Sequence, residues 1–151
     1  MRVLLRSVRD DTTVLVAFDG SDPGVAALEY ALREYADDDI TVLTVVNPAL
    51  SGGEGIGGFP ASSEVWFEQA REEAEDRLDE ARALADRSGV DVDTAVEAGR
   101  PSSVIVEYAD EHDVEYVVLG SHGRDGLSRV LLGSVAEAVV RQSPVPVTVV
   151  R

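Results

Sequence analysis

The sequence predicts an α/β fold, with an open, Rossmann-like sheet of five parallel strands and helices on both faces. Short apolar, β-branched runs typical of buried strands alternate along the chain with longer segments whose apolar residues recur at helical spacing. Such alternation forms parallel sheets covered on both faces, and right-handed crossovers leave few arrangements. A length of 151 residues suits one domain. We therefore expect one unit over 1–151, with an N-terminal extension at 1–11 and a loop at 47–63.

Turn and cap residues bound the elements predicted in the first half of the chain. Asp19-Gly20 ends the first strand, and Pro23 stands where helices accept proline, with Asp22 as the expected N-cap. Gly89 ends the long second helix as a C-terminal cap. These elements are a strand at 12–18, a helix from 23 to about 35, a strand at 40–46 and a helix from 64 to about 87.

The second half repeats the alternation of strand and helix. Its elements are a strand at 92–98, a helix from 101, a strand at 115–121, a helix from 134 to about 142 and a strand at 145–150. The strand at 92–98 alternates more than the others, which places it near a sheet edge. Ligands of such sheets bind outside the carboxyl ends of the strands, where strand order reverses. Asp19-Gly20 and Gly120-Ser121 end the first and fourth strands, so we expect them to be neighbours there.

The charge balance restricts the partners. The chain holds 29 acidic and 13 basic residues, for a formal net charge of −16, and every basic residue is arginine. Such a surface repels nucleic-acid backbones. Its self-repulsion is screened at about 1 M salt, where the Debye length is roughly 3 Å, and the composition resembles that of proteins from salt-loving archaea. No apolar run is long enough for a membrane span, no signal peptide is recognisable, and cysteine is absent. We expect a cytoplasmic protein that binds neither membrane nor nucleic acid.

A glycine pattern follows the fourth strand, in the stretch GSHGRDGLSRVLLGS from Gly120 to Ser134. Glycine permits close approach of a backbone to phosphate, and Gly133-Ser134 begins a helix whose first N–H groups and dipole favour an anion. The spacing is neither the dinucleotide fingerprint nor the Walker P-loop. From the pattern alone two interpretations stay open: a phosphate cradle, or glycines that only turn the chain and cap a helix.

The stretch GSHGRDGLSRVLLGSVAEAVV resembles the nucleotide-binding signature of the universal stress protein family: Gly, two residues, Gly, nine residues, Gly, then Ser or Thr. Gly120, Gly123, Gly133 and Ser134 meet that count. VLVAFDGS near the start, AGRPSSVIVEYADEHDVEYVVLGSHG and SPVPVTVV are also similar to the family. The resemblance covers nearly the whole chain apart from the first eleven residues and the loop after the second strand.

The resemblance implies strand order 3-2-1-4-5 with a nucleotide at the reversal: ATP, ADP or AMP, with Mg²⁺. It implies that Asp19 contacts the ribose and that Val45 contacts the adenine through its backbone. The residues implied to hold or line the phosphates are Gly120, Ser121, His122, Gly123, Arg124, Gly133, Ser134 and Val135. The simpler alternatives are a turn cap for Asp19, packing for His122, surface charge for Arg124 and core packing for Val45.

The residue pattern favours binding over turnover, because no dedicated base or substrate pocket is recognisable. We expect a nucleotide-binding stress-response or signalling protein, with weak ATP hydrolysis as a by-product. The alternatives are a slow ATPase or kinase-like enzyme and a nucleotide-independent dimeric scaffold. The resemblance implies a homodimer through Val145–Val150, although burial of this strand beneath residues 1–11 would also protect its edge. The glycine-rich loop 51–62 is a candidate cover over the ligand.

Overall fold

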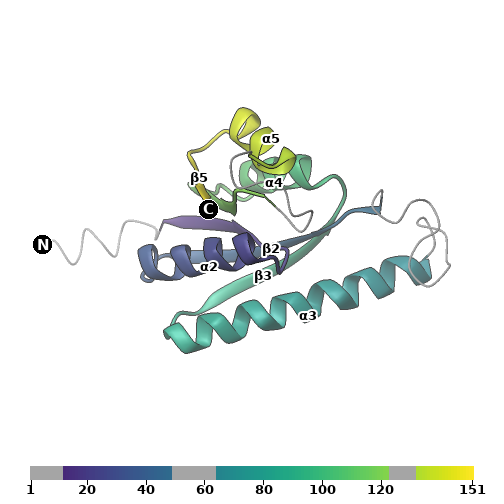
Figure 1. Ribbon diagram of the computed structural model, residues 1–151, viewed down its shortest axis with the longest axis horizontal. Helices are drawn as coiled ribbons and strands as arrows, with labels where there is room; N and C mark the ends of the chain where they lie inside the picture. Colours follow the sequence, from purple (N-terminus) through teal and green to yellow (C-terminus); the bar gives the residue numbers. More distant parts are fainter. Residues whose placement is uncertain (1–11, 49–63, 123–131) are drawn as a thin grey trace, which may run out of the picture.

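Figure 1 shows the computed structural model of the chain, which describes residues 12–48, 64–122 and 132–151. Five strands form one parallel sheet in the order β3-β2-β1-β4-β5, which confirms the predicted fold class and strand order. The strands are β1 (Thr13–Ala17), β2 (Asp39–Val46), β3 (Val92–Ala98), β4 (Tyr116–Gly120) and β5 (Val147–Val150). The 51–62 loop, on which the predicted cover falls, lies outside the described residues.

Helices cover both faces of this sheet. They are α2 (Asp22–Glu34), α3 (Glu64–Ser88), α4 (Pro101–Glu111) and α5 (Ser134–Gln142). In Figure 1, α2 and α3 lie on one side of the strands and α4 and α5 on the other. Side chains of β1 alternate between the two cores: Val14 and Val16 pack with α2 and α3, whereas Leu15 packs with α4 and α5. The near-continuous apolar character of β1 follows from burial on both faces.

The turn into α2 corrects one expected cap. Ser21, not Asp22, is the N-cap: its Oγ accepts a hydrogen bond from the backbone N–H of Gly24 at 3.1 Å. Asp22 is the first helical residue, where its charge favours the helix dipole, and Pro23 follows it in the first turn. At the end of α3, Gly89 has φ +70°, as the predicted C-terminal cap requires.

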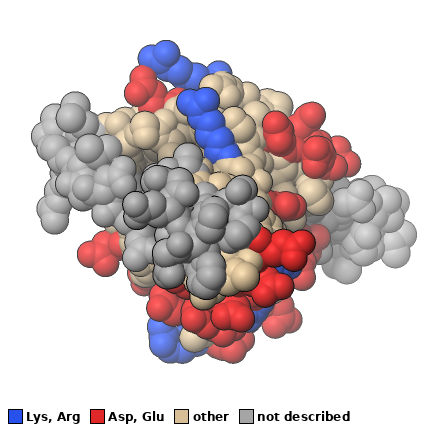
Figure 2. All heavy atoms as spheres, turned by 90° about the vertical axis from the view of Figure 1, so that its right-hand side faces the viewer, with Lys and Arg blue, Asp and Glu red and all other residues tan. Residues whose placement is uncertain are grey.

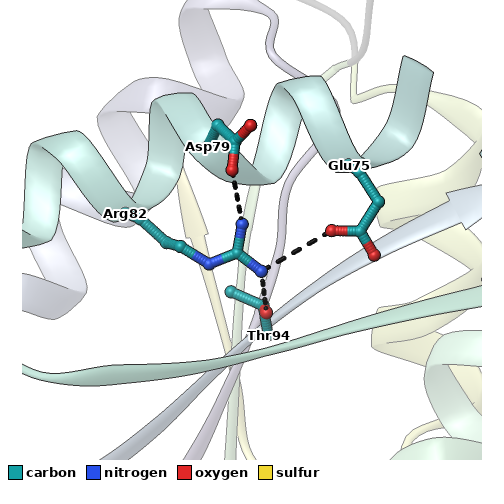
Figure 3. A network of polar contacts seen from close by, with 4 residues as sticks. All are labelled: Glu75, Asp79, Arg82 and Thr94. Carbon is teal, nitrogen blue, oxygen red and sulfur yellow. Dashed lines mark hydrogen bonds and ion pairs between the residues drawn. The ribbon is translucent and has the colours of Figure 1, made fainter. Parts of the chain in front are cut away.

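An arginine on α3 ties this helix to strand β3 (Figure 3). Arg82 donates to Asp79 Oδ1 at 2.7 Å and to Thr94 Oγ1 at 2.6 Å, and its Nη2 lies 3.6 Å from Glu75 Oε2. Asp79 and Glu75 stand on the same helix, whereas Thr94 belongs to β3. The bond to Thr94 therefore fixes the helix over the edge of the sheet.

The two edges of the sheet differ in chemistry. Strand β3, predicted near an edge, forms one edge, and its Asp93 and Glu97 are exposed. Strand β5 forms the other edge with the uncharged, partly exposed sequence VTVV. It begins two residues later than predicted, although the carbonyl of Pro146 still accepts from the N–H of Val117 at 3.0 Å. None of the helices in the described ranges has both the length and the apolar character that crossing a membrane requires.

Candidate functional site

The reversal of strand order lies between β1 and β4. The chain passes from β1 to β2 and β3 on one side, then returns to place β4 and β5 on the other. Val16 is level with Val118, and the same register carried two residues further places Phe18 level with Gly120. The turns that start at Asp19 and at Ser121 are therefore neighbours, as the sequence predicts. Parallel sheets bind ligands at such a position.

Strand β2 fixes the point where Asp19 leaves the sheet. The N–H of Phe18 donates to the carbonyl of Leu43 at 2.9 Å, and the hydroxyl of Thr44 donates to the carbonyl of Phe18 at 2.9 Å. Thr44 is 1% exposed, so this second bond is shielded from water. Both backbone polar groups of Phe18 are thus satisfied, and the next residue begins its turn from a rigid position.

Asp19 organises the turn that follows β1. Its Oδ1 accepts from the backbone N–H of Ser21 at 3.0 Å and from the Ser21 hydroxyl at 2.5 Å. Ser21 in turn caps α2, so a chain of hydrogen bonds joins Asp19 to the helix. Oδ1 of Asp19 thus caps the turn, as the simpler alternative for this residue predicts. Within residues 12–48, 64–122 and 132–151 the other oxygen, Oδ2, accepts no hydrogen bond.

Gly120 has a packing reason to be glycine. A Cβ at this position would lie 2.7 Å from the Cβ and the carbonyl carbon of Pro23, and 2.8 Å from the Pro23 oxygen. The end of β4 therefore touches the first turn of α2 directly. This contact sets the separation between the Asp19 turn and the Ser121 turn, so Gly120 shapes the site even without touching a ligand.

The two ends of the glycine stretch meet at Ser121. The N–H of Gly133 donates to the Ser121 carbonyl at 2.6 Å, and a Cβ at Gly133 would lie 2.9 Å from the Cα of His122. Ser121 is buried, and its hydroxyl lies 3.1 Å from Nδ1 of the half-buried His122. Thus Gly120–His122 and Gly133–Ser134 form one compact corner. Gly123 and Arg124 lie outside the described residues.

Backbone N–H groups of the two helices at this corner differ in availability. The first turn of α2 is capped by Ser21, whereas α5 begins after Gly133, which has no side chain to cap it. Helix N-termini leave their first N–H groups unpaired unless a cap or a ligand satisfies them. The N–H groups of Ser121 and Gly133 are not available, because they donate to Val150 and Ser121 respectively. An anion at this corner would therefore meet the N–H groups of Ser134 and Val135.

Val45 lies near the carboxyl end of β2, one strand from β1. Its side chain packs half-buried against the core beneath α4 and α5, and its register partner is Glu97 of β3. The side chain of Val45 therefore packs in the core, as the simpler alternative for this residue predicts. Val45 therefore lies at the same end of the sheet as the Asp19 turn.

Arg77 was missed by the sequence analysis. A Cβ at Gly20, which has φ +79°, would lie 3.6 Å from Cγ and 3.8 Å from Cδ of Arg77, so the arginine stem passes over the Asp19–Ser21 turn. Within the described parts of the chain, Arg77 forms no ion pair. The arginine directly precedes the buried Leu78 of α3, but nothing in the sequence shows that this helix face meets the end of β1.

The face around this corner is acidic. Figure 2 shows the edge that faces right in Figure 1, where acidic side chains gather in the lower part, over α3. The exposed acidic residues in the first half of that helix are Glu64, Glu68, Glu72, Glu73 and Asp76. A cation such as Arg77 is therefore an exception here, and a polyanionic ligand would need local positive groups.

The profile of the universal stress protein family matches residues 12–151. The chain belongs to this family. Universal stress protein MJ0531 of Methanocaldococcus jannaschii is 33% identical over 140 residues, which are 91% of this chain and 81% of that protein. Among solved structures, MJ0577 of the same organism has a TM-score of 0.76 at 26% identity and covers 94% of this chain and 96% of its own. A universal stress protein solved in complex with cAMP has a TM-score of 0.68 at 27% identity, covering 95% and 98%.

Proposed function

We propose that this universal stress protein binds an adenine nucleotide at the corner between β1, β4 and α5, and that binding serves regulation or signalling in a stress response. The observation that carries the proposal is the meeting of Gly120–His122 with Gly133–Ser134 beside the Asp19 turn. The similar universal stress protein solved in complex with cAMP supports a nucleotide in this fold. Of the possible ligands we favour ATP, with ADP and AMP as the smaller forms.

Within this proposal, individual residues take the roles that the family resemblance implies, and their positions support those roles. Oδ2 of Asp19 would accept from a ribose hydroxyl while Oδ1 stays bound to Ser21. The backbone of Val45 would contact the adenine. The N–H groups of Ser134 and Val135, at the uncapped start of α5, would donate to phosphate. Gly120 and Gly133 would act by allowing close packing rather than by donating. Ser121, His122, Gly123 and Arg124 would line the same phosphates.

Arg77 would add positive charge beside the ligand. Its stem already lies against Gly20, so its guanidinium needs only rotamer changes to approach a bound anion. Mg²⁺ would arrive on the phosphates of ATP. Within the described residues no group of three His, Asp or Glu side chains is placed to hold a metal ion.

A homodimer through β5 is the second part of the proposal. The edge strand Val147–Val150 is uncharged and only partly covered in the chain by itself. Pairing of two such edges would satisfy their backbone groups. Sedimentation of the protein across a concentration series tests this part independently of nucleotide, and a monomer at all concentrations would contradict it.

Calorimetric titration in concentrated KCl tests the nucleotide site. We expect binding of ATP, and Asp19→Asn should weaken it by at least about 10-fold, because a hydrogen bond to a charged group contributes roughly 1.5–3 kcal/mol. Asp22→Asn is the matched control: it removes the same charge three residues later, on an exposed side chain, and should bind as the wild type does. Absence of heat with ATP, ADP, AMP and cAMP would overturn the proposal.

A single-turnover assay with labelled ATP separates binding from catalysis. We expect slow or no hydrolysis. Turnover that is lost in both Asp19→Ala and His122→Ala, with ATP still bound, would favour the ATPase alternative instead. Gly123→Val extends the test to the loop, since a branched side chain there should block backbone approach to phosphate and reduce binding.

A further inference from the structure

Three tyrosines form a patch at the amino end of the sheet, opposite the nucleotide corner. Tyr30 and Tyr35 come from the end of α2, and Tyr116 is the first residue of β4. The rings of Tyr35 and Tyr116 stack with centroids 5.8 Å apart, and Tyr30 meets Tyr35 edge-on at 6.4 Å. Tyr116 is 37% exposed. The chain thus presents most of its tyrosine, three of four residues, on one small surface, the tyrosine patch.

Carboxylates surround the tyrosine patch. Glu34, Asp39 and Glu115 are exposed, and Asp38 is half-buried. Burial raises the pKa of Tyr35, and the neighbouring Tyr30, Tyr116, Asp38 and Glu34 raise it further, which indicates a negative local potential. Aromatic faces attract cations in the same way, and the guanidinium of Arg33 already lies 5.8 Å from the centroid of the Tyr30 ring. Such a surface favours a ligand that carries guanidinium groups.

The chain enters the sheet beside this patch. The carbonyl of Thr12 accepts from the N–H of Asp39 at 2.9 Å. The N–H of Thr13 donates to the side chain of Glu115 at 3.1 Å, and the Glu115 N–H donates to the Thr13 carbonyl at 2.8 Å. The next residue, Val14, is level with Tyr116. Whatever precedes Thr12 is therefore attached between two of the carboxylates that surround the patch.

We propose that the tyrosine patch and its carboxylates bind residues 1–9 of the same chain. That segment, MRVLLRSVR, holds three arginines and no acidic residue in a chain of net charge −16, so its charge complements the surface beside its own attachment point. Its valines and leucines suit the parts of the patch that are open to solvent, since Tyr116 is 37% exposed and Tyr30 and Tyr35 are half-buried. Nine residues reach at most about 30 Å when extended, which is ample for a patch that begins at the next strand. Attachment also gives the segment a high effective concentration there, on the order of millimolar.

Fluorine NMR of the full-length protein, with 3-fluorotyrosine at all four tyrosines, tests this assignment. Single Tyr→Phe variants assign the resonances. The test variant carries Arg2→Gln, Arg6→Gln and Arg9→Gln. We expect it to shift the resonances of Tyr35 and Tyr116 by more than their line widths. The Tyr108 resonance should stay in place, because Tyr108 lies on α4, stacked on His112, on the other face of the sheet.

A variant with Arg71→Gln, Arg100→Gln and Arg141→Gln changes the net charge equally at exposed positions on other elements. It should leave the patch resonances unchanged. Equal shifts in this variant, or no patch shift in the test variant, would overturn the proposal. The proposal would also be overturned if the difference in patch resonances between the test variant and the wild type vanished on 100-fold dilution. The occupant would then be the segment of a second copy. Tyrosine shifts seen only after adding a separate arginine-rich peptide to the wild type would assign the patch to a basic peptide from another protein instead.

Discussion

Substitution of Gly120 by alanine probes the contact that sets the width of the corner between β1, β4 and α5, where we propose that a nucleotide binds. The added Cβ would stand 2.7 Å from Pro23, about 0.7 Å short of ordinary van der Waals contact. Two of the three atoms it meets are backbone, in a helical turn capped by Ser21, so no rotamer change relieves the clash. Overpacking of this kind costs typically 1–3 kcal/mol, and the loss of glycine entropy in the unfolded chain offsets roughly 0.4–1 kcal/mol.

We therefore expect Gly120→Ala to lower the free energy of unfolding by about 1–2 kcal/mol. For a chain of this length, that lowers the melting temperature by roughly 2–8 °C. Trp66 is the single tryptophan and is 2% exposed, so its fluorescence follows unfolding in urea at constant KCl. Because α2 must move away from β4, we also expect ATP affinity to fall by about 10-fold or more, that is by at least about 1.4 kcal/mol.

Gly89→Ala is the control for this prediction. Among the described residues, chain neighbours apart, no atom lies within 4 Å of a Cβ at Gly89. Because φ there is +70°, alanine should cost about 1–2 kcal/mol through backbone strain alone. The two variants should thus have similar stability and differ in ATP affinity, with Gly89→Ala close to the wild type. Wild-type stability in Gly120→Ala would refute the packing argument, and equal ATP affinity in the two variants would refute the link from packing to the site.

Three further outcomes follow from the described contacts. Ser21→Ala should lower the free energy of unfolding by about 1 kcal/mol through loss of the cap, measured by urea unfolding, whereas Ser21→Asn should restore most of it. Arg82→Gln should cost about 1 kcal/mol because it loses the bond to Thr94, and thermal melts should show no such loss for a fully exposed arginine. Burial raises the pKa of Tyr35 and of Tyr108, so the folded state holds their phenolic protons more tightly than the unfolded state does. The resulting contribution to the free energy of unfolding is present below about pH 10 and is lost as pH rises through the folded pKa values. Unfolding curves from pH 9 to above pH 10 should show this decline, and it should be weaker in Tyr35→Phe.

Nearly all element bounds were predictable, because apolar period and cap residues are local signals. The strand order was implied by the family resemblance and not by any local pattern. The runs at 40–46 and 92–98 and the cap at Gly89 needed no tertiary information. The choice between Ser21 and Asp22 as N-cap did need it, since both residue types cap helices well. Asp19 decides it by holding the Ser21 hydroxyl in place.

The sequence pointed to the corner between β1, β4 and α5, but it did not reveal the contacts that form this corner. The glycine count located the corner, yet the reason for Gly120 is a proline almost a hundred residues earlier, which no local pattern reveals. Arg77 was not predictable either, because only the packing of α3 brings it to the Asp19 turn. The sequence also does not show which backbone N–H groups are available. Those of Ser121 and Gly133 donate to other backbone groups, so an anion would contact the N–H groups at the start of α5 instead.

The difference between the two edges of the sheet would limit how many copies of the chain can join edge to edge. Addition of strands in series would require the VTVV edge of one copy to meet the β3 edge of the next, where Asp93 and Glu97 would lose water with no cation to replace it. Salt screens the repulsion between such carboxylates but does not remove the cost of dehydrating them. A union of two β5 edges would leave only acidic edges facing outward, so it could not propagate. In the proposed dimer, the chemistry that lets two β5 edges pair would therefore also stop growth after two copies, which would keep the sheet from seeding a fibre.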